Sequence, residues 1–326
     1  MKGTDIHIAA EWLKKGEVIA IPTETVYGLA ANALNSIAVA KIFEIKKRPR
    51  FNPLIVHIKH VEMLCDIATH IDERLLKLFY AFSPGPLTIL VDKKPIISDI
   101  VTAGRPQVAV RIPNHPLTLQ LLYSIDFPLA APSANPFQYI SPTSAEQVEE
   151  QLGNKIPYIL DGGKCVVGIE STIVGIENDE IMVYRLGGIS IEDIEAVAGK
   201  VKLKNTINTE ISNYSIDSPG QLKTHYAPKK PLILGDIKNL LQEYPNKKVA
   251  VISFGKTDFA KYPTIKEYNL SPQAHLQEAA SRFFEILYAT DQSDAEVILA
   301  QLLPDTGLGR AINDRLQRAA KENKNN

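Results

Sequence analysis

One short segment of the chain holds the side chains best suited to chemistry. Two cations, Lys46 and Arg48, are followed by Asn52, which has a proline on each side at Pro49 and Pro53. Because proline fixes the angle φ, this backbone is stiff and holds the side chains in place. Cations and an amide held in this way suit the phosphates of a polyanionic ligand. The alternative is a solvated helix end, where cations complement the helix dipole.

A polar turn earlier in the chain offers hydroxyl groups. Thr23 and Thr25 follow an apolar strand predicted over residues 18–21. Ligands of α/β sheets bind at loops that follow strands, so we expect Thr25 to bind substrate. The alternative is a capped turn. His57 ends a second predicted strand, over residues 54–58, and a histidine there is more often a hydrogen-bonded structural group than a catalyst.

Two later segments add an arginine and small polar residues. Arg111 lies in the apolar run 108–112, and burying it costs free energy unless it meets an anion. The alternative is an edge strand with the Arg111 side chain in water. The small residues of segment 130–135 let a ligand approach the backbone closely, and Ser133 and Ser141 offer neutral hydrogen bonds.

These groups require a sheet whose strands end close to one another. Over the first 200 or so residues, short apolar strands alternate with helical patterns. A helix is predicted from Asn35 or Ser36 to about Lys47, where Pro49 ends it. Another is predicted to start within residues 141–146, with Pro142 in its first turn. Several strands follow one another with no helix between them. The sequence therefore predicts an α/β fold with a mixed sheet.

The composition changes after residue 202 and divides the chain. We predict a catalytic domain over residues 1–202 and a linker over 203–230, in which Asn, Thr, Ser and Lys become frequent. A second α/β pattern follows over residues 231–326. It predicts a smaller, Rossmann-like C-terminal domain.

The bulk composition limits the classes of function. The chain has 326 residues and a net charge of -1, which argues against a protein that mainly grips nucleic acid. Its two cysteines, Cys65 and Cys165, exclude a disulfide scaffold and fit a reducing compartment. No apolar run reaches the roughly 18 residues that cross a membrane, and the N-terminus lacks the core of a signal peptide. We therefore expect a cytoplasmic protein without membrane contact.

The motifs, taken in chain order, resemble those of a known family. The motifs that resemble the YrdC-like family are Pro22-Thr23-Glu24-Thr25-Val26-Tyr27-Gly28-Leu29, Lys46-x-Arg48-Pro49 and Pro53-Leu54-x-x-His57. Within that family, the linker resembles that of the two-domain threonylcarbamoyl-AMP synthases, at Ser218-Pro219-Gly220 and His225-Tyr226-Ala227-Pro228. The resemblance implies a twisted mixed sheet with flanking helices, together with the C-terminal domain.

The resemblance also implies two neighbouring binding sites. The residues that it assigns to ATP are Arg48, Asn52, Gln107, Ser133, Ser141 and Arg185. The residues that it assigns to L-threonine are Thr25, His57, Arg111, Ala131 through its backbone, and Ser171. Lys46 and Arg48 are the implied catalytic cations, which stabilise charge on the phosphates. Gln107 stands where a small hydroxyl residue is expected in the family.

The implied reaction joins L-threonine, bicarbonate or CO2, and ATP into threonylcarbamoyl-adenylate and releases pyrophosphate. Mg2+ is expected to accompany ATP, with no dedicated protein ligands and no separate metal site. The implied partners are a downstream tRNA threonylcarbamoyl transferase and, through weak contact, tRNA itself. The modified position is adenosine 37 of tRNAs that decode ANN codons.

The linker is predicted to close over the active site. Closure excludes water from a labile mixed anhydride, and Tyr226 offers an aromatic face and a hydroxyl to the nucleotide. The alternative is that Tyr226 only anchors the linker. Two other functions fit parts of the pattern: a double-stranded RNA-binding or ribosome-assembly module, and a carbamoyl transferase.

Overall fold

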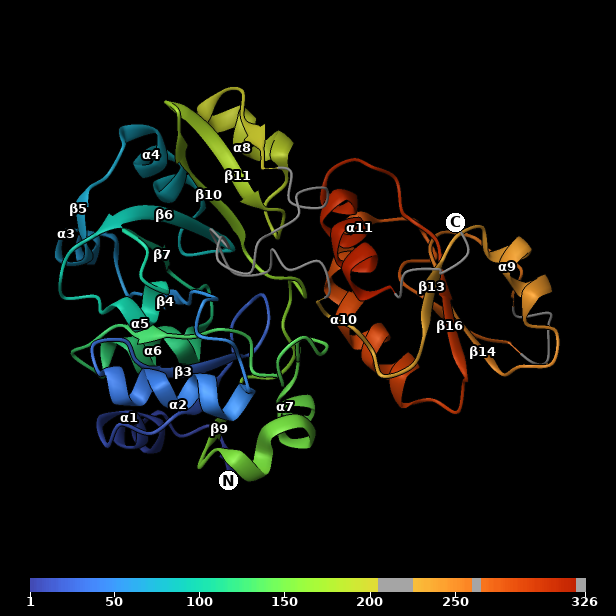
Figure 1. Ribbon diagram of the computed structural model, residues 1–326, viewed down its shortest axis with the longest axis horizontal. Helices are drawn as coiled ribbons and strands as arrows, with labels where there is room; N and C mark the ends of the chain where they lie inside the picture. The colour runs from blue at the N-terminus through green and yellow to red at the C-terminus, as the bar shows by residue number, and fades with distance from the viewer. Residues whose placement is uncertain (205–224, 260–264, 321–326) are drawn as a thin grey trace. The chain divides into compact units, whose positions relative to one another are not determined.

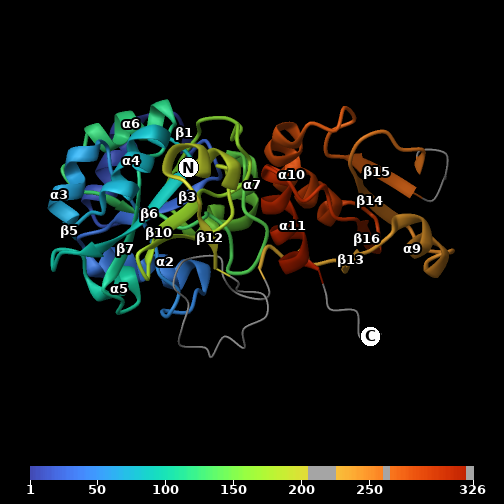
Figure 2. The same cartoon turned by 90° about the horizontal axis from the view of Figure 1, so that it is seen from above.

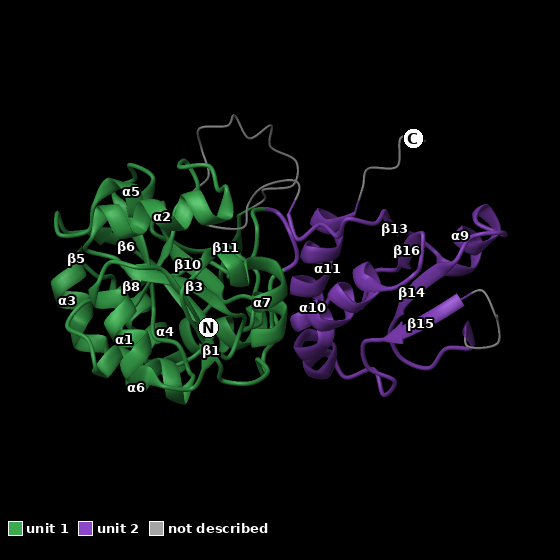
Figure 3. Ribbon diagram, turned by 90° about the horizontal axis from the view of Figure 1, so that it is seen from below, with its two compact units in different colours: residues 1–137, 141–222 green, residues 138–140, 223–326 purple. Residues whose placement is uncertain are grey.

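The computed structural model of the protein describes residues 1–204, 225–259 and 265–320. These residues form two compact units, which Figure 3 colours separately. The first unit holds residues 1–137 and 141–204, and the second holds residues 138–140 together with the described residues from 225 onward. No helix in these ranges is both long and apolar enough to cross a membrane. Of the predicted linker, residues 205–224 lie outside the described residues.

The first unit is built on a mixed sheet of twelve strands among the described residues (Figure 1). In spatial order its strands are β1 (Lys2–Gly3), β9 (Ile159–Leu160), β2 (Ile19–Ile21), β3 (Gly28–Asn32), β8 (Leu129–Ala130), β4 (Ile55–His57), β7 (Gln107–Arg111), β6 (Leu87–Lys93), β10 (Thr172–Glu177), β11 (Glu180–Arg185) and β12 (Lys202–Leu203), with β5 (Ala68–His70) beside β6. Strand β7 runs parallel to β4 and antiparallel to β6, so the predicted mixed sheet is confirmed.

Helices cover this sheet on both faces. Their bounds are α1 (Ile6–Lys14), α2 (Ser36–Lys46), α3 (Leu64–Ile67), α4 (Glu73–Phe82), α5 (Asp99–Thr102), α6 (Pro116–Tyr123), α7 (Ala145–Leu152) and α8 (Ile191–Ala198), with short 3-10 turns at Val61–Met63 and Gly153–Lys155. The helix predicted to start within residues 141–146 does start there, but without Pro142 in its first turn. Helix α7 begins at Ala145, because the Ser144 side chain caps it and the Pro142 carbonyl accepts from Tyr27 N instead.

The two faces of the sheet differ in what covers them. The main core joins α2, α4 and α8 to one face, through strand residues such as Val56 and Val110. On the other face, α1 and α6 pack over β2, β3, β8 and β9. The rest of that face carries a small cluster of strand residues only, Ile55, Leu90, Ala109, Ile173 and Tyr184, with Met182 beside it. The first five of these residues are buried, although their cluster contains no helix residue among those described, and we call this area the open face.

Helix α2 ends in a way that fixes the cationic segment. Lys47 adopts the left-handed conformation at φ 53°, its N–H donates to Glu44 O, and Arg48 N donates to Phe43 O at 2.8 Å. This pair of bonds is a Schellman motif, which stops a helix and turns the chain sharply. The helix thus ends before Pro49, and Arg48 is the first residue after the turn.

The second unit is a parallel sheet between helices. Its strands, in spatial order, are β13 (Leu232–Leu234), β16 (Val297–Ala300), β14 (Val249–Ser253) and β15 (Ile265–Asn269). Helix α9 (Ile237–Glu243) packs on one face, and α10 (Leu276–Gln292) and α11 (Leu308–Ala319) lie on the other, as Figures 1 and 2 show. Buried parallel strands between helices agree with the predicted Rossmann-like domain.

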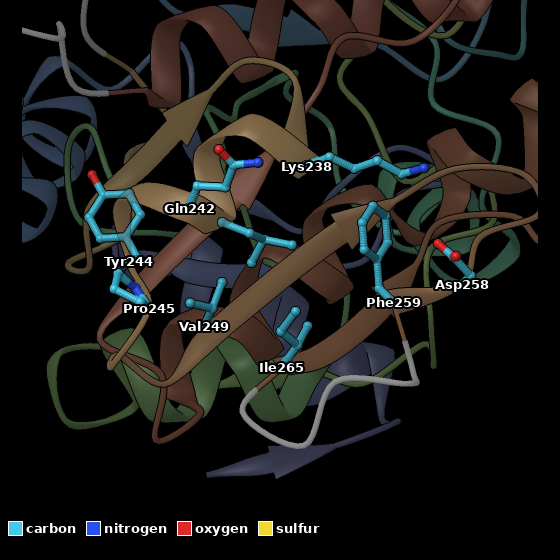
Figure 4. Close-up of a pocket in the computed structure, with 9 residues that line it drawn as sticks. Lys238, Gln242, Tyr244, Pro245, Val249, Asp258, Phe259 and Ile265 are labelled. Atoms are coloured by element: carbon cyan, nitrogen blue, oxygen red, sulfur yellow. The ribbon is translucent and has the colours of Figure 1, made fainter.

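A cavity of about 470 Å³ opens in the second unit beside α9 (Figure 4). Lys238 and Gln242 of α9, Tyr244 just after it, and Val249 and Ile265 at the starts of β14 and β15 are among the residues that line it. None of its lining residues belongs to the predicted sites. The residues predicted to bind threonine lie in the first unit instead.

Candidate functional site

The pairing of β4 and β7 places His57 next to Arg111. The two strands are parallel, with Ile55 opposite Ala109 and His57 opposite Arg111. Because side chains alternate along a strand, His57 and Arg111 point to the same face as Ile55 and Ala109. Both residues therefore lie on the open face.

Arg111 is held by three protein acceptors. Its Nε donates to Gly85 O at 3.1 Å, Nη1 donates to Thr25 Oγ1 at 2.9 Å, and Nη2 donates to Glu24 Oε1 at 2.5 Å. Asn114 N donates to the other Glu24 oxygen at 2.9 Å. Arg111 and Glu24 are both only 4% exposed, so the alternative of an edge arginine in water is wrong. A buried ion pair thus stands beside Thr25.

His57 is a neutral group in this arrangement. Burial, and then the nearby Arg111 cation, lower the pKa of His57 from 6.5 to about 3. One ring nitrogen, Nδ1, lies 3.3 Å from Ile55 O. A neutral imidazole beside a cation can offer hydrogen bonds to a polar ligand without adding positive charge.

Ser171 and Arg185 meet at the end of neighbouring strands. Arg185 donates through Nε and Nη2 to Ser171 O, at 3.0 and 2.8 Å, and Nη2 also donates to Ser171 Oγ at 3.0 Å. The Ser171 hydroxyl lies 2.7 Å from Thr88 Oγ1. Residue Thr88 belongs to β6, the strand next to β7. The structure thus joins one residue assigned to threonine with one assigned to ATP.

Arg48 and Asn52 form a second polar group, at the amino end of β4. Arg48 Nη2 donates to Asn52 Oδ1 at 2.6 Å and to Pro53 O at 2.8 Å, and its Nε donates to Asn52 O at 3.2 Å. Asn52 is fully buried, and its Nδ2 has no acceptor within the described part of the chain. A buried amide donor left in this way is suited to an acceptor on a ligand.

Lys46 anchors the segment that carries Ser133. Its Nζ donates to Ser133 O at 2.6 Å and to Asn135 O at 2.5 Å. Lys46 is 2% exposed, and burial together with the Arg48 charge lowers its pKa well below the usual value. The alternative of a solvated helix end is therefore wrong for Lys46 and, at 7% exposed, for Arg48.

Ser141 is paired with a buried carboxylate. Its hydroxyl donates to Glu170 Oε1 at 2.7 Å, and both residues are buried. The backbone around Glu170 is closely packed as well, since a Cβ on Gly187 would lie 2.3 Å from Glu170 O. That contact explains why a glycine follows Leu186 here.

Three predicted site residues remain: Gln107, Ala131 and Tyr226. Gln107 is half-buried at the start of β7, and the register of β4 and β7 puts it at the same end of the sheet as Asn52. Ala131 N donates to Ile55 O at 3.0 Å, so a ligand contact through its backbone would use the carbonyl. Tyr226 lies in the second unit, 1% exposed, with its ring 5.4 Å from that of Phe284. Its contact with ATP stays a prediction.

Comparison with known proteins identifies the family. A family model described as "Telomere recombination" matches residues 11–187, and one described as "Threonylcarbamoyl-AMP synthase, C-terminal domain" matches residues 189–321. The threonylcarbamoyl-AMP synthase of Bacillus subtilis is 40% identical over 320 residues, which are 96% of this chain and 92% of that protein. The chain belongs to the threonylcarbamoyl-AMP synthase family.

Solved structures of the same family match over nearly the whole chain. The crystal structure of Pyrococcus abyssi Sua5 complexed with L-threonine is 37% identical, with a TM-score of 0.89 and coverage of 97% of this chain and 94% of that one. A variant of P. abyssi Sua5 with a histidine and the following tyrosine changed to alanine also has a TM-score of 0.89 and is 34% identical. The predicted membership of the threonylcarbamoyl-AMP synthase family, in its long two-domain form, and the predicted fold are thus confirmed.

The sequence analysis gives no role to two buried carboxylates of the site. Glu24 and Glu170 each stand inside a motif, but their partners Arg111 and Ser141 lie 87 and 29 positions away in the chain. A carboxylate inside an otherwise apolar or small-residue motif indicates a buried polar contact, because a buried carboxylate must meet a cation or a hydrogen-bond donor.

Proposed function

We propose that the protein is a threonylcarbamoyl-AMP synthase. It condenses L-threonine, bicarbonate or CO2, and ATP to threonylcarbamoyl-adenylate and releases pyrophosphate. The observation that carries the proposal is the buried Arg111 group on the open face, in a chain whose relatives bear that activity in their name.

Arg111 is suited to bind the carboxylate of threonine. A guanidinium has five N–H donors, and three of them bond to Gly85, Thr25 and Glu24, which leaves two among the described residues. Two N–H groups on the terminal nitrogens match the two oxygens of a carboxylate. His57, as a neutral imidazole, and the Thr25 hydroxyl then face the polar groups of the amino acid.

The Arg48–Asn52 group and the segment held by Lys46 are suited to the nucleotide. Asn52 Nδ2 is a buried donor that an ATP oxygen or ring nitrogen can satisfy. Ser133 and Ser141 add hydroxyls, and Arg185 adds a buried cation. Arg48 and Arg185 are the groups that we assign to the phosphates, whereas Lys46 keeps the Ser133 segment in position through its bonds to backbone carbonyls.

The chemistry needs no protein nucleophile. With CO2, the threonine amine bonds to the carbon and loses a proton to solvent. With bicarbonate, the amine bonds to the carbon, and the amine proton and the hydroxyl of bicarbonate leave together as water. An oxygen of this carbamate then bonds to the α-phosphorus of ATP, while the bond from that phosphorus to pyrophosphate breaks. The protein's part is to position the reactants and to stabilise the charge on the phosphates.

Mg2+ belongs to this proposal as the companion of ATP. No group of three or more His, Cys, Asp or Glu that could hold a metal occurs within the described ranges. Mg2+ is commonly bound by phosphates and water, and the ion proposed here would be bound in the same way. When bound, the ion would neutralise charge on the pyrophosphate.

The wider role is also proposed. The labile adenylate passes to a tRNA threonylcarbamoyl transferase that acts on adenosine 37 of tRNAs decoding ANN codons, with weak contact to tRNA, in the cytoplasm. The linker is proposed to close over the site and to protect the adenylate, with Tyr226 near the nucleotide. The near-neutral net charge of -1 does not favour a double-stranded RNA-binding module.

A direct assay tests the proposal. The protein is incubated with ATP, bicarbonate and radiolabelled threonine, and both threonylcarbamoyl-adenylate and pyrophosphate are measured. We expect both products only when all three substrates are present. Equal pyrophosphate release without threonine would overturn the proposal.

A further inference from the structure

Strand β6 of the first unit lies between two strands that carry parts of the threonine site. Its neighbours in the sheet are β7, which ends at Arg111, and β10, which begins directly after Ser171 (Figure 1). Arg111 and Ser171 are both assigned to threonine, whereas β6 carries no assigned residue. A polar residue of β6 that shares their face of the sheet is therefore a candidate for a further part of the site.

Thr88 is the polar residue of β6 that faces the site. It pairs with Ile173 of β10, and Leu90 lies two residues further along β6. Both Ile173 and Leu90 belong to the open face. Side chains alternate along a strand, and register partners on neighbouring strands point to the same face, so Thr88 points to the open face as well. It thus stands between the end of β7 and the start of β10.

The Thr88 hydroxyl has one partner. Thr88 is fully buried, and its Oγ1 lies 2.7 Å from Ser171 Oγ. Of the residues that the structure describes, only Ser171 forms a hydrogen bond with this hydroxyl. Leaving a buried hydroxyl proton without an acceptor costs free energy. The Thr88 proton is therefore donated to Ser171 Oγ.

This bond determines what the Ser171 hydroxyl can still do. Arg185 Nη2 also donates to Ser171 Oγ, at 3.0 Å. A hydroxyl oxygen has two lone pairs and one proton, and Thr88 and Arg185 together use both lone pairs. The Ser171 proton then has no acceptor within the described part of the chain. Since Ser171 is fully buried, this proton needs an acceptor on a ligand.

We propose that Thr88 is a positioning residue for threonine, which makes Ser171 a hydrogen-bond donor to the carboxylate of the bound amino acid. The inference rests on the proposed function, within which Ser171 belongs to the threonine site. A carboxylate only accepts hydrogen bonds, so a serine held as a donor fits it, whereas the ammonium group of threonine only donates. Arg111 and Ser171 then hold the carboxylate from the strands on either side of β6. Thr88 acts through Ser171 and does not touch the ligand.

The test compares Thr88→Val with a matched control in the full-length protein. Valine has nearly the shape of threonine without its hydroxyl, and it is favoured in strands. The control is Thr102→Val, because Thr102 is also buried and its hydroxyl donates to Arg105 O at 3.0 Å, outside the assigned residues. In calorimetric titration we expect Thr88→Val to raise the Kd for threonine about fivefold and to leave the Kd for ATP within about twofold. Thr102→Val should keep both Kd values.

Two further variants separate positioning from a general effect on the fold. Thr88→Ser keeps the donor, so its Kd for threonine should stay within about twofold of wild type. In a cycle with Ser171→Ala, Thr88→Val should cause no further loss of threonine affinity, because Thr88 acts through Ser171. Ser171→Ala alone leaves the buried Thr88 proton without its acceptor, so the double variant should have the higher urea midpoint of the two. Additive losses of threonine affinity would overturn the proposal.

The group of the ligand that Ser171 meets is tested with L-threoninol, which has no carboxylate. Its Kd should be the same for wild type and Thr88→Val, because the acceptor of the Ser171 proton is missing in both. A rise in this Kd as large as that for threonine would overturn the assignment to the carboxylate.

The outcomes also distinguish this inference from the proposed function. If Ser171→Ala raises the Kd for threonine but Thr88→Val does not, or if Thr88→Val raises both Kd values equally, the inference is wrong and the function stands. If Ser171→Ala leaves the Kd for threonine unchanged, the assignment of Ser171 to threonine fails, and the inference fails with it. If wild type releases no threonine-dependent pyrophosphate, the proposed function itself fails.

Discussion

Removing Arg111 alone should destabilise the protein more than removing Arg111 and Glu24 together. The two charges are 2.5 Å apart and each side chain is 4% exposed. Arg111→Met leaves the buried Glu24 carboxylate with Asn114 N as its one remaining partner in the described part of the chain. Breaking a buried pair in this way costs about 3–5 kcal/mol. In the double variant, with Glu24→Gln, no unpaired charge remains.

The cost of the double variant can be worked from the bonds that it loses. Gly85 O and Thr25 Oγ1 each lose the donor that Arg111 provided, at about 1 kcal/mol each, or about 2 kcal/mol in total. The glutamine carbonyl can still accept from Asn114 N. We therefore expect the double variant to be about 1–3 kcal/mol more stable than Arg111→Met.

Threonine binding should respond differently from stability. Both variants lose the two N–H groups proposed for the carboxylate, each worth about 1.5 kcal/mol or more as a bond to a charged group. The Kd for threonine should rise on the order of 100-fold in both, while the Kd for ATP stays close to that of wild type.

Urea unfolding and calorimetric titration of threonine and ATP measure these effects. Arg74→Met is the matched control, because Arg74 pairs with Asp72 and Asp179 at the surface, where such pairs contribute little. If the double variant is no more stable than Arg111→Met, an unpaired buried charge is not the cause. If either variant keeps its threonine Kd within threefold, Arg111 does not hold the carboxylate.

Three further predictions follow from single side chains. Lys46→Met should raise KM for ATP at least tenfold and leave KM for threonine unchanged. The carbonyls of Ser133 and Asn135 lose the donor that holds the segment proposed for the nucleotide. Equal changes in both KM values would contradict this. His57→Gln should flatten the pH dependence of stability. His57 takes up a proton near pH 6.5 in the unfolded chain but only near pH 3 in the native protein. The free energy of unfolding of wild type therefore falls as the pH falls from 6.5 to 3, by at most about 1.4 kcal/mol per pH unit. Unfolding midpoints at pH 7 and 5 check this, and parallel curves for the two proteins would disprove it. Gly187→Ala should lower the urea midpoint clearly more than the control Gly153→Ala. The new Cβ at position 187 would lie 2.3 Å from the backbone oxygen of Glu170, whereas the new Cβ at position 153 would lie 3.3 Å from the flexible Glu149 side chain. Equal urea midpoints for the two variants would refute this packing argument.

Local signals in the sequence were enough to place several elements. The sequence predicts helices over residues 116–123 and 191–198, and α6 and α8 have these bounds. Helix α6 begins at Pro116, and α8 follows the cap at Ser190. The sequence does not predict strand β3, because Gly28–Asn32 is rich in alanine, which has a low strand propensity. The strand forms through its pairing with β2 and β8. Strand β15 was missed because it is a polar edge strand, Ile265–Asn269.

For the candidate site, the sequence predicts individual residues but not the contacts between them. Motifs located Thr25, His57 and Arg111, but not the bonds between them. The Arg111 bond to Glu24 spans 87 residues, and the two meet only because β7 is central in the sheet. The tie from Lys46 to the backbone at Asn135 spans 89 residues and uses carbonyls, which every residue carries. Spacing along the chain holds no information about contacts of this kind.

The Tyr139 hydroxyl donates to Asp291, and the two residues are made at very different times. The two residues are 152 positions apart. At synthesis rates of about 5–20 residues per second, Tyr139 leaves the ribosome roughly 8 to 30 s before its acceptor exists. All strands and helices from β1 to β12 precede residue 225, so the large sheet can assemble during that interval. A ribosome-bound chain can therefore complete the large sheet, and with it position Arg48 and Arg111, before residue 291 is made.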